Sequence, residues 1–159
     1  MSYPQTTHAK HAKQYLRQRI ETSSPEELLI MLYEGAIRFL VTAKKALPEN
    51  DIQTFHNNLI RTQNIITEFM SSLDMDLGGE TAVNLFNLYE YLNYRLVQAN
   101  IKKDAEMIDE VLDHLRKLKD TWQEAIRLSH REREALKKEI EGEPLDLEPI
   151  VDGQRSYSV

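Results

Sequence analysis

The chain has no cysteine, few turn-forming residues and no long apolar run. Without cysteine it can form neither disulfides nor thiolate sites, which agrees with a cytoplasmic protein. Five glycines and five prolines among 159 residues are too few for a turn-rich β fold. No apolar stretch approaches the roughly 20 residues that span a bilayer, and the N-terminal residues lack the apolar segment of a secretory signal. We therefore expect a cytosolic protein without a membrane span.

The distribution of charge predicts how the chain is divided. The net charge of −6 at pH 7 argues against a nucleic-acid partner, because general affinity for nucleic acid comes from neutralising phosphates. Residues 1–20 contain basic but no acidic side chains, whereas the charged residues near the C-terminus are mostly acidic. We expect a flexible basic leader over 1–13 and a helical domain over 14–128. Over 129–159 we expect a charged helical extension followed by a disordered acidic tail.

The sequence contains a sharply marked helix start at Ser24. The Ser24 hydroxyl can accept from unpaired amides of the first turn, and Pro25 fits the first helical position. Glu27 completes a capping box with Ser24. One apolar stripe of the following helix consists of Leu29, Leu32, Ala36, Leu40, Ala43 and Leu47, and a second of Ile30, Ile37 and Val41. A helix that is apolar on two sides is either central in its fold or has a surface that awaits a partner.

Three further segments repeat the spacing of apolar residues that is typical of packed helices. Asp51 and Asp104 are suitable N-caps for two of them, and Gly78 and Gly79 interrupt the chain before the third. This pattern predicts an all-α, antiparallel, up-down four-helix bundle. A short N-terminal cap segment over Gln14 to Glu21 precedes it, either as a helix or as an extended strap. The three seams are Ile52, Phe55, Leu59, Thr62, Ile66, Phe69 and Leu73; Ala82, Leu85, Tyr89, Leu92, Leu96 and Ala99; and Ile108, Val111, Leu115, Leu118, Trp122 and Ala125.

Catalytic and metal-binding signatures are missing from these helices. A di-iron bundle site needs Glu-x-x-His pairs that project inward, and none occurs in the helices. His56 and His114 fall outside the seams, and His8 with His11 lacks a third ligand. The DMDLGGE turn does not have the acidic spacing of a calcium loop. We therefore expect no enzyme activity, no cofactor and no metal.

The third helix of the predicted bundle carries more apolar surface than its seam requires. Val83, Phe86, Tyr94 and Val97 flank the seam, and Tyr91 points elsewhere again. Tyrosine is enriched at partner interfaces because it combines a large, stiff ring with a polar tip. These rings are either half-buried against neighbouring helices or exposed. Exposed apolar area would be covered by a second copy of the chain or by an amphipathic helix of another protein.

The stretch from Tyr15 to Ile37 resembles the N-terminal signature of the FliS family of bacterial flagellin-export chaperones. It reads Y-x4-I-x-T-x-S-P-x-E-L-L-I-M-L-Y-E-G-A-I. The resemblance covers about residues 15–128. It continues through Asn58-Leu59, Gln63 to Ile66, Ser72 to Asp74, Gly78 to Glu80, Asn84-Leu85, Leu88 to Tyr91, Arg95 to Asn100, Asp104, Glu110-Val111 and Trp122.

This resemblance implies a cytosolic chaperone of the flagellar type III export system. It would bind the C-terminal amphipathic segment of flagellin, prevent premature polymerisation and deliver flagellin to the export apparatus. Other flagellar regulators or a co-chaperone are further implied partners. The resemblance also implies a cap segment over Tyr15 to Ile20 that occupies the groove when the chaperone is free. The candidate partner contacts are Tyr15 and Ile20 in the cap segment, and Ile30, Tyr33, Ile37, Tyr91 and Tyr94 in the groove.

Two alternatives remain open from the residues themselves. A self-associating structural bundle would bury its extra apolar faces against a second copy of the chain. A metal-dependent bundle enzyme would require stoichiometric iron or manganese.

Overall fold

A computed structural model describes residues 7–142. The regular secondary structure of these residues consists of α-helices joined by short connections, so they have the predicted all-α class. The predicted acidic tail beyond Gly142 lies outside the described residues. The five helices are α1 (Thr7–Thr22), α2 (Pro25–Ala46), α3 (Ile52–Ser72), α4 (Met75–Lys102) and α5 (Ala105–Gly142).

Side chains at the predicted positions begin three of these helices. The Ser24 Oγ accepts a hydrogen bond from the amide of Glu27 at 3.2 Å, and Pro25 is the first residue of α2. The Asp51 Oδ1 accepts from the amide of Thr54 at 3.1 Å, before α3. The Asp104 Oδ1 accepts from the amide of Glu106 at 2.9 Å, before α5. Each contact satisfies an amide that the helix itself leaves unpaired.

Helix α1 starts earlier than the sequence analysis expected. It begins at Thr7 rather than near Gln14, so much of the segment expected to be a flexible leader is helical. Alanine, lysine and glutamine, which are strong helix formers, dominate residues 9–14 and account for the earlier start. The segment preceding Ser24 is therefore a helix and not an extended strap.

Helix α4 contains a sharp bend at Gly79, where the sequence predicted a break. Its first turn is capped by Asp74, whose Oδ1 accepts from the amides of Asp76 and Leu77. Gly79 then has φ 53° and ψ −133°, which is not helical. Glycine adopts positive φ without steric cost, whereas a side chain there would be strained. The bend lets the rest of α4 follow a direction independent of its capped first turn.

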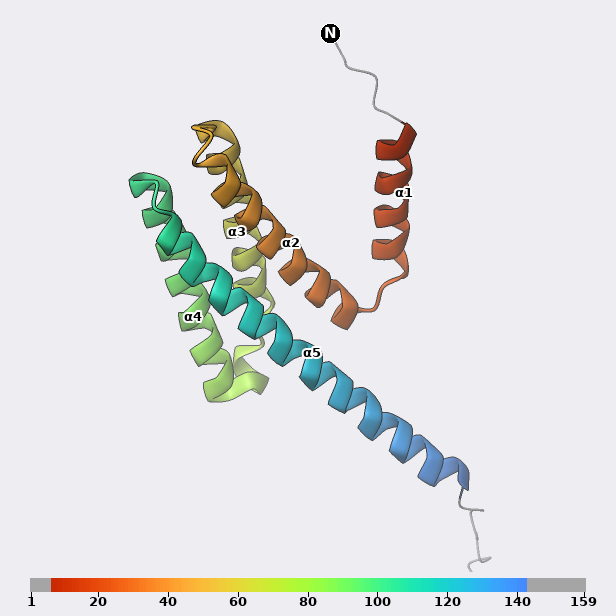
Figure 1. The fold of residues 1–159 in the computed structure, drawn as a ribbon. Helices are drawn as coiled ribbons and strands as arrows, with labels where there is room; N and C mark the ends of the chain where they lie inside the picture. Colours follow the sequence, from red (N-terminus) through yellow and green to blue (C-terminus); the bar gives the residue numbers. More distant parts are fainter. Residues whose placement is uncertain (1–6, 143–159) are drawn as a thin grey trace, which may run out of the picture. The chain divides into compact units, whose positions relative to one another are not determined.

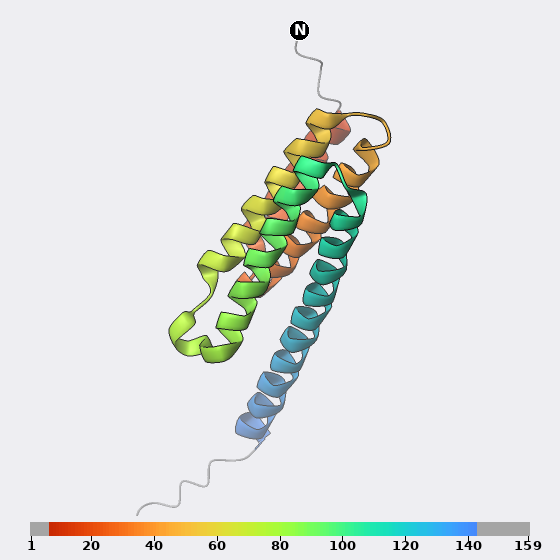
Figure 2. The same cartoon turned by 90° about the vertical axis from the view of Figure 1, so that its left-hand side faces the viewer.

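One hydrophobic core joins residues from α2, α3, α4 and the first part of α5. Figures 1 and 2 show α2, α3 and α4 side by side, each running opposite to the one before it. The fully buried side chains of this core include Leu40, Leu59, Ile66, Leu92, Leu96, Ile108, Val111 and Leu115.

Three aromatic rings link α2, α3 and α4 at the centre of this core. The ring of Tyr33 stacks on Phe69 with centroids 4.3 Å apart, and Phe69 packs against Tyr89 at 5.5 Å. The hydroxyls of Tyr33 and Tyr89 share a buried hydrogen bond of 2.5 Å. Burial raises the pKa of both phenols, and their shared hydrogen bond raises the pKa of Tyr33 further while it opposes the rise at Tyr89. Both phenols therefore stay neutral and use their hydroxyls to satisfy each other.

The chain divides into two compact units, of which residues 124–159 form the second. Its described part is the helical segment up to Gly142, in which nearly all residues are exposed. Arg127 donates to Glu124, and Lys137 lies 3.9 Å from Glu141, so neighbouring turns are linked by ion pairs. Such exposed pairs contribute only a few tenths of a kcal/mol each.

Substitution of Tyr33 tests its place in the core. Tyr33→Ala removes the ring stacked on Phe69, and we expect it to lower the free energy of unfolding by roughly 3–5 kcal/mol. Tyr33→Phe keeps the ring and removes only the hydroxyl partner of Tyr89, so its expected cost is about 1 kcal/mol. Urea unfolding followed by circular dichroism measures both. Equal, small effects would contradict a core position for this ring.

Candidate partner-binding surfaces

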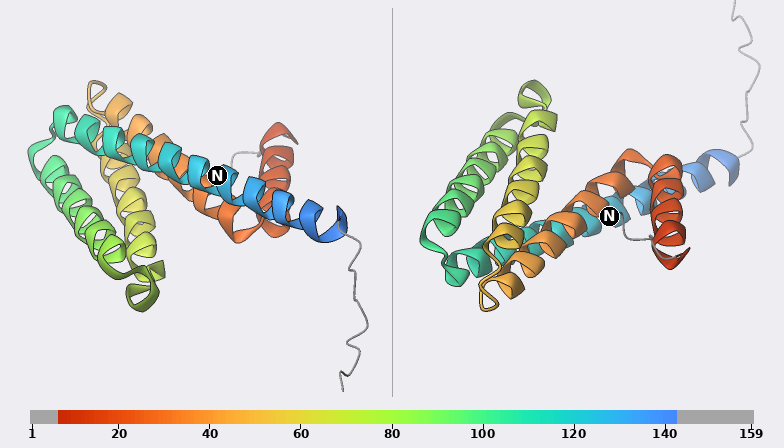
Figure 3. Two further views of the ribbon diagram at one scale, coloured as in Figure 1. Left: turned by 90° about the horizontal axis from the view of Figure 1, so that it is seen from below. Right: turned by 90° about the horizontal axis from the view of Figure 1, so that it is seen from above.

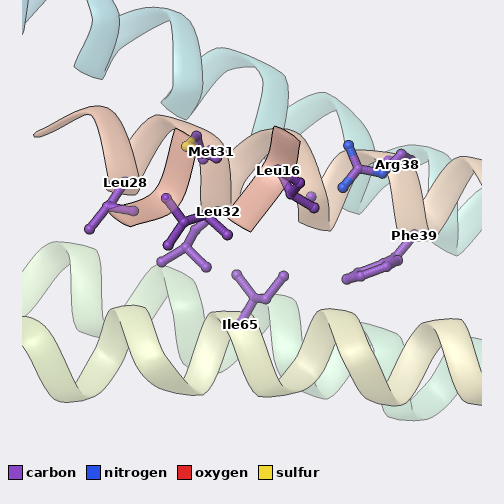
Figure 4. Close-up of a pocket in the computed structure, with 9 residues that line it drawn as sticks. Leu16, Leu28, Met31, Leu32, Arg38, Phe39 and Ile65 are labelled. Carbon is purple, nitrogen blue, oxygen red and sulfur yellow. The ribbon is translucent and has the colours of Figure 1, made fainter. Parts of the chain in front are cut away.

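An apolar pocket lies where α1 meets α2 and α3. Its cavity volume is about 350 Å³. Leu16 and Ile20 of α1 form one wall, and Ile65 of α3 points from the opposite side towards α2 (Figure 4). We call it the α1 pocket. Its remaining lining comes from α2, namely Leu28, Met31, Leu32, Gly35, Arg38 and Phe39.

The pocket exists because α2 has apolar residues beside its core stripe. Leu28, Leu32 and Phe39 are spaced by four and seven residues, so they share one face of the helix. Gly35 on that face has no side chain, and a Cβ there would lie 3.8 Å from the Ile65 side chain, an ordinary contact distance. The guanidinium of Arg61 lies 5.6 Å from the Phe39 ring centre and borders the pocket with charge. The result is an apolar hollow with a basic rim.

Helix α1 covers this pocket through a small contact. None of its residues is buried, and Leu16 and Ile20 both remain 45% exposed. Figure 3 shows α1 beside the first part of α2 in both views. Full burial of such a side chain contributes about 1.5–3 kcal/mol, so two half-buried ones contribute on the order of 2–3 kcal/mol. A helix of this length is marginal by itself in water, so α1 is held in place weakly.

A second apolar surface lies on α4. Tyr94, Val97 and Ile101 are exposed and spaced as i, i+3 and i+7, so they follow one side of the helix. Tyr91 lies beside them, next to α5, with the His114 ring at 6.5 Å in an edge-on arrangement. Tyr91 is 42% and Tyr94 58% exposed. We call these four residues of α4 (Tyr91, Tyr94, Val97 and Ile101) the tyrosine surface.

A continuous hydrogen-bond network holds both tyrosine hydroxyls. Tyr91 donates to Glu110 of α5. Arg95 donates through Nε to the same carboxylate at 2.9 Å and through Nη1 to the side-chain oxygen of Gln98 at 2.9 Å. Gln98 in turn donates to the Tyr94 hydroxyl at 2.9 Å. The hydrogen bonds from Tyr91 and then from Arg95 lower the pKa of Glu110, and the bond to Glu110 raises the pKa of Tyr91.

The structure places three of the seven predicted contact residues, Ile20, Tyr91 and Tyr94, on these two surfaces. Ile20 lines the α1 pocket, whereas Tyr15, although on the same helix, is largely exposed and not part of the lining. Ile30 and Ile37 are half-buried on a different face of α2, and Ile37 packs against the core.

Tyr33 has no exposed surface, so its prediction as a groove contact is at odds with its position in the core. Tyr33 is predicted on the groove side of its helix, but its ring turns inward to reach Phe69 and Tyr89. Tyr91 and Tyr94 both belong to the tyrosine surface.

Most residues that line the α1 pocket were not predicted as partner contacts. Leu16 lies in the predicted cap segment and Leu32 in the predicted core stripe, but no partner contact is predicted for Leu28, Met31, Phe39 or Ile65. The available signal was Gly35, because a glycine in a helix interior costs about 1 kcal/mol relative to alanine and its open side shows where that helix face lacks bulk.

Two kinds of feature are absent from residues 7–142: a metal-ligand cluster and a membrane-spanning helix. Within residues 7–142, no three His, Asp or Glu side chains converge as metal ligands. None of the helices in this range combines the length and apolar character needed to cross a bilayer.

The helical region up to residue 129 is similar to known flagellar proteins. The family described as Flagellar protein FliS matches residues 8–129. The flagellar secretion chaperone FliS of Bacillus subtilis is 35% identical over 119 residues, which cover 75% of this chain and 88% of that protein. The corresponding chaperone of Salmonella typhimurium is 35% identical over 115 residues, with coverages of 72% and 85%.

A solved structure supports the fold independently. The crystal structure of a bacterial flagellar chaperone has a TM-score of 0.61 and covers 74% of this chain and 96% of its own. Its sequence identity of 22% restricts that likeness to the fold.

The pH dependence of stability tests the network around Glu110. Its folded-state pKa is lowered, so ionised Glu110 stabilises the fold above its unfolded pKa of about 4.3. That contribution is lost as the pH falls through the folded-state pKa. We expect the difference in melting temperature between the unaltered chain and Glu110→Gln to be constant from about pH 7 to 5 and to shrink below about pH 4. Thermal unfolding across this range measures it, and a difference independent of pH would contradict the network.

Proposed function

The chain belongs to the FliS family of flagellar secretion chaperones, and from this premise we propose that it binds the C-terminal segment of flagellin in the cytosol. Members of this family are chaperones and not enzymes. In the proposed role, the chain keeps flagellin from polymerising early and delivers it to the flagellar export apparatus. The four helices α2 to α5 act as an antiparallel bundle that carries the client, and α1 acts as the cap segment.

The observation that supports this proposal is the α1 pocket. An amphipathic segment polymerises through its apolar stripe, and an apolar hollow of matching character can cover that stripe. The hollow is filled at its edge by Leu16 and Ile20, which are the kind of residues that such a client would supply. Helix α1 therefore acts as an internal substitute for the client.

Energetics favour exchange between α1 and a client. The contact of Leu16 and Ile20 contributes on the order of 2–3 kcal/mol, whereas a micromolar complex corresponds to about 8 kcal/mol. A client can therefore displace α1 without ATP. The competing cap segment lowers the apparent affinity by the fraction of molecules in which it is closed, and this assists later release.

The predicted contact residues have different places in this proposal. Ile20 acts within the cap segment, and Tyr15 remains a predicted contact on the exposed side of α1. Tyr91 and Tyr94 are proposed to touch the client at the tyrosine surface. Ile30 and Ile37 remain predicted contacts, available only through their exposed parts.

Truncation of the cap contact tests the proposal. The double variant Leu16→Ala, Ile20→Ala removes the side chains through which α1 contacts the pocket. We therefore expect it to bind a flagellin C-terminal peptide about 3- to 10-fold more tightly. The melting temperature should change little, because α1 contributes no buried residue. Isothermal titration calorimetry measures the affinity.

Gln18→Ala, on the same helix and exposed, is the matched control and should bind like the unaltered chain. Weaker binding by the double variant would show that α1 contacts the client directly and would contradict the cap role. Absence of binding by the unaltered chain would remove the proposed client.

A further inference from the structure

The tyrosine surface is unusual because the polar tips of both rings are tied down while their faces remain open. Tyr91 and Tyr94 are three residues apart on α4, and both hydroxyls join one network. An exposed tyrosine normally samples several rotamers, and fixing such a side chain on binding costs conformational entropy. Here the folded chain has already fixed both rings before any partner arrives.

Glu110 is the centre of that network. Its carboxylate accepts from Tyr91 and from two nitrogens of Arg95, and the Arg95 Nη2 lies 2.8 Å from the Glu110 Oε2. Because Glu110 belongs to α5 and the other members to α4, the network also fixes α4 against α5 at this level. Arg95 and Glu110 are both partly shielded, at 24% and 32% side-chain exposure, so water screens their attraction less than at a fully exposed pair.

A second argument comes from which apolar surface is open. Helix α1 covers one side of the α1 pocket, whereas the tyrosine surface is exposed among the described residues. A client that must displace α1 needs a first contact outside the covered pocket. The exposed stripe of Tyr94, Val97 and Ile101, with its i, i+3, i+7 spacing, provides that contact for the apolar stripe of a helix.

We propose that Glu110, Arg95 and Gln98 are positioning residues that hold Tyr91 and Tyr94 as a preformed docking surface for the apolar stripe of flagellin. This inference rests on the proposed function and adds where the client first binds and which residues prepare that site. The three polar residues act through the two rings, which make the contact. A rigid aromatic surface binds faster and more tightly than the same rings free to rotate.

The decisive experiment compares neighbouring carboxylates on α5. Glu110→Gln keeps the shape of the side chain but loses the charge that holds Arg95 and an acceptor for Tyr91. We expect it to weaken binding of the flagellin C-terminal peptide by about 3- to 10-fold. The matched control is Asp109→Asn, which breaks the 2.6 Å ion pair with Lys44 but touches neither tyrosine. Its affinity should stay within about 2-fold of the unaltered chain.

Two further measurements separate positioning from general structural damage. Gln98→Ala removes the hydrogen bond to the Tyr94 hydroxyl and the one from Arg95 Nη1, but leaves the Arg95–Glu110 pair in place. It should weaken binding by about 2- to 5-fold. In NMR spectra of the free protein, the ring signals of Tyr94 should show increased motion in this variant, while the Tyr91 signals stay unchanged. A purely structural role would affect neither ring selectively.

The outcomes are distinguishable from failure of the proposed function. If the unaltered chain does not bind the peptide, the proposed function fails and the inference with it. If it binds and the Glu110 and Gln98 variants bind equally well, the inference alone is overturned. If sedimentation shows a dimer that Tyr94→Ala dissociates, the surface serves a second copy of the chain and the inference is also overturned.

Discussion

The stacking of Tyr33 on Phe69 and the hydroxyl contact from Tyr33 to Tyr89 are the constraint on which the rest of the structure depends. They join α2, α3 and α4 at one level and fix the rotation of each helix about its axis. A fully buried phenol must keep a hydrogen-bond partner, so this arrangement has little freedom to slip. Once the rotation of α2 is fixed, Leu28, Leu32 and Phe39 fall outside the central core. Once that of α4 is fixed, Tyr94, Val97 and Ile101 face outward.

The two apolar surfaces outside the core differ in whether another part of the chain covers them. The α1 pocket is covered by a segment of the same chain, whose contact is worth only a few kcal/mol and can be exchanged. The tyrosine surface stays open, but its rings are tied by hydrogen bonds to Arg95, Gln98 and Glu110. Because α1 covers the pocket, unwanted association there is limited. Because hydrogen bonds hold the hydroxyls of Tyr91 and Tyr94, the exposed rings lose less side-chain entropy on binding. Together they suit a protein that must hold a client firmly and later release it.

Local signals in the sequence were sufficient for the helical architecture. Ser24, Asp51 and Asp104 cap their helices as expected, because capping depends on a few neighbouring residues. Gly79 marks the bend in α4 for the same reason. The all-α class and the membership of the FliS family also follow from the chain itself. The start of α1 at Thr7 differs from the prediction because the alanine, lysine and glutamine residues of the leader favour a helix even though the segment is polar and basic.

The partner surfaces were harder to predict because they depend on which side of each helix the core uses. Helical spacing placed Tyr33 on the groove side, yet its ring turns inward to join Phe69 and Tyr89. The same spacing gave no reason to select Leu28 or Met31, which line the pocket only because α1 and Ile65 lie opposite them. The network from Tyr91 to Tyr94 passes through Glu110, which is on another helix, so no single stretch of sequence reveals it.

The proposed exchange of α1 for a client is tested most directly by amide hydrogen exchange on the full-length chain, with and without a saturating flagellin C-terminal peptide. We expect the amides of α1, from Thr7 to Thr22, to exchange faster when the peptide is bound, while those around Tyr33, Phe69 and Tyr89 keep their protection. Unchanged or increased protection of α1 in the presence of bound peptide would contradict the view that this helix occupies the site of the client.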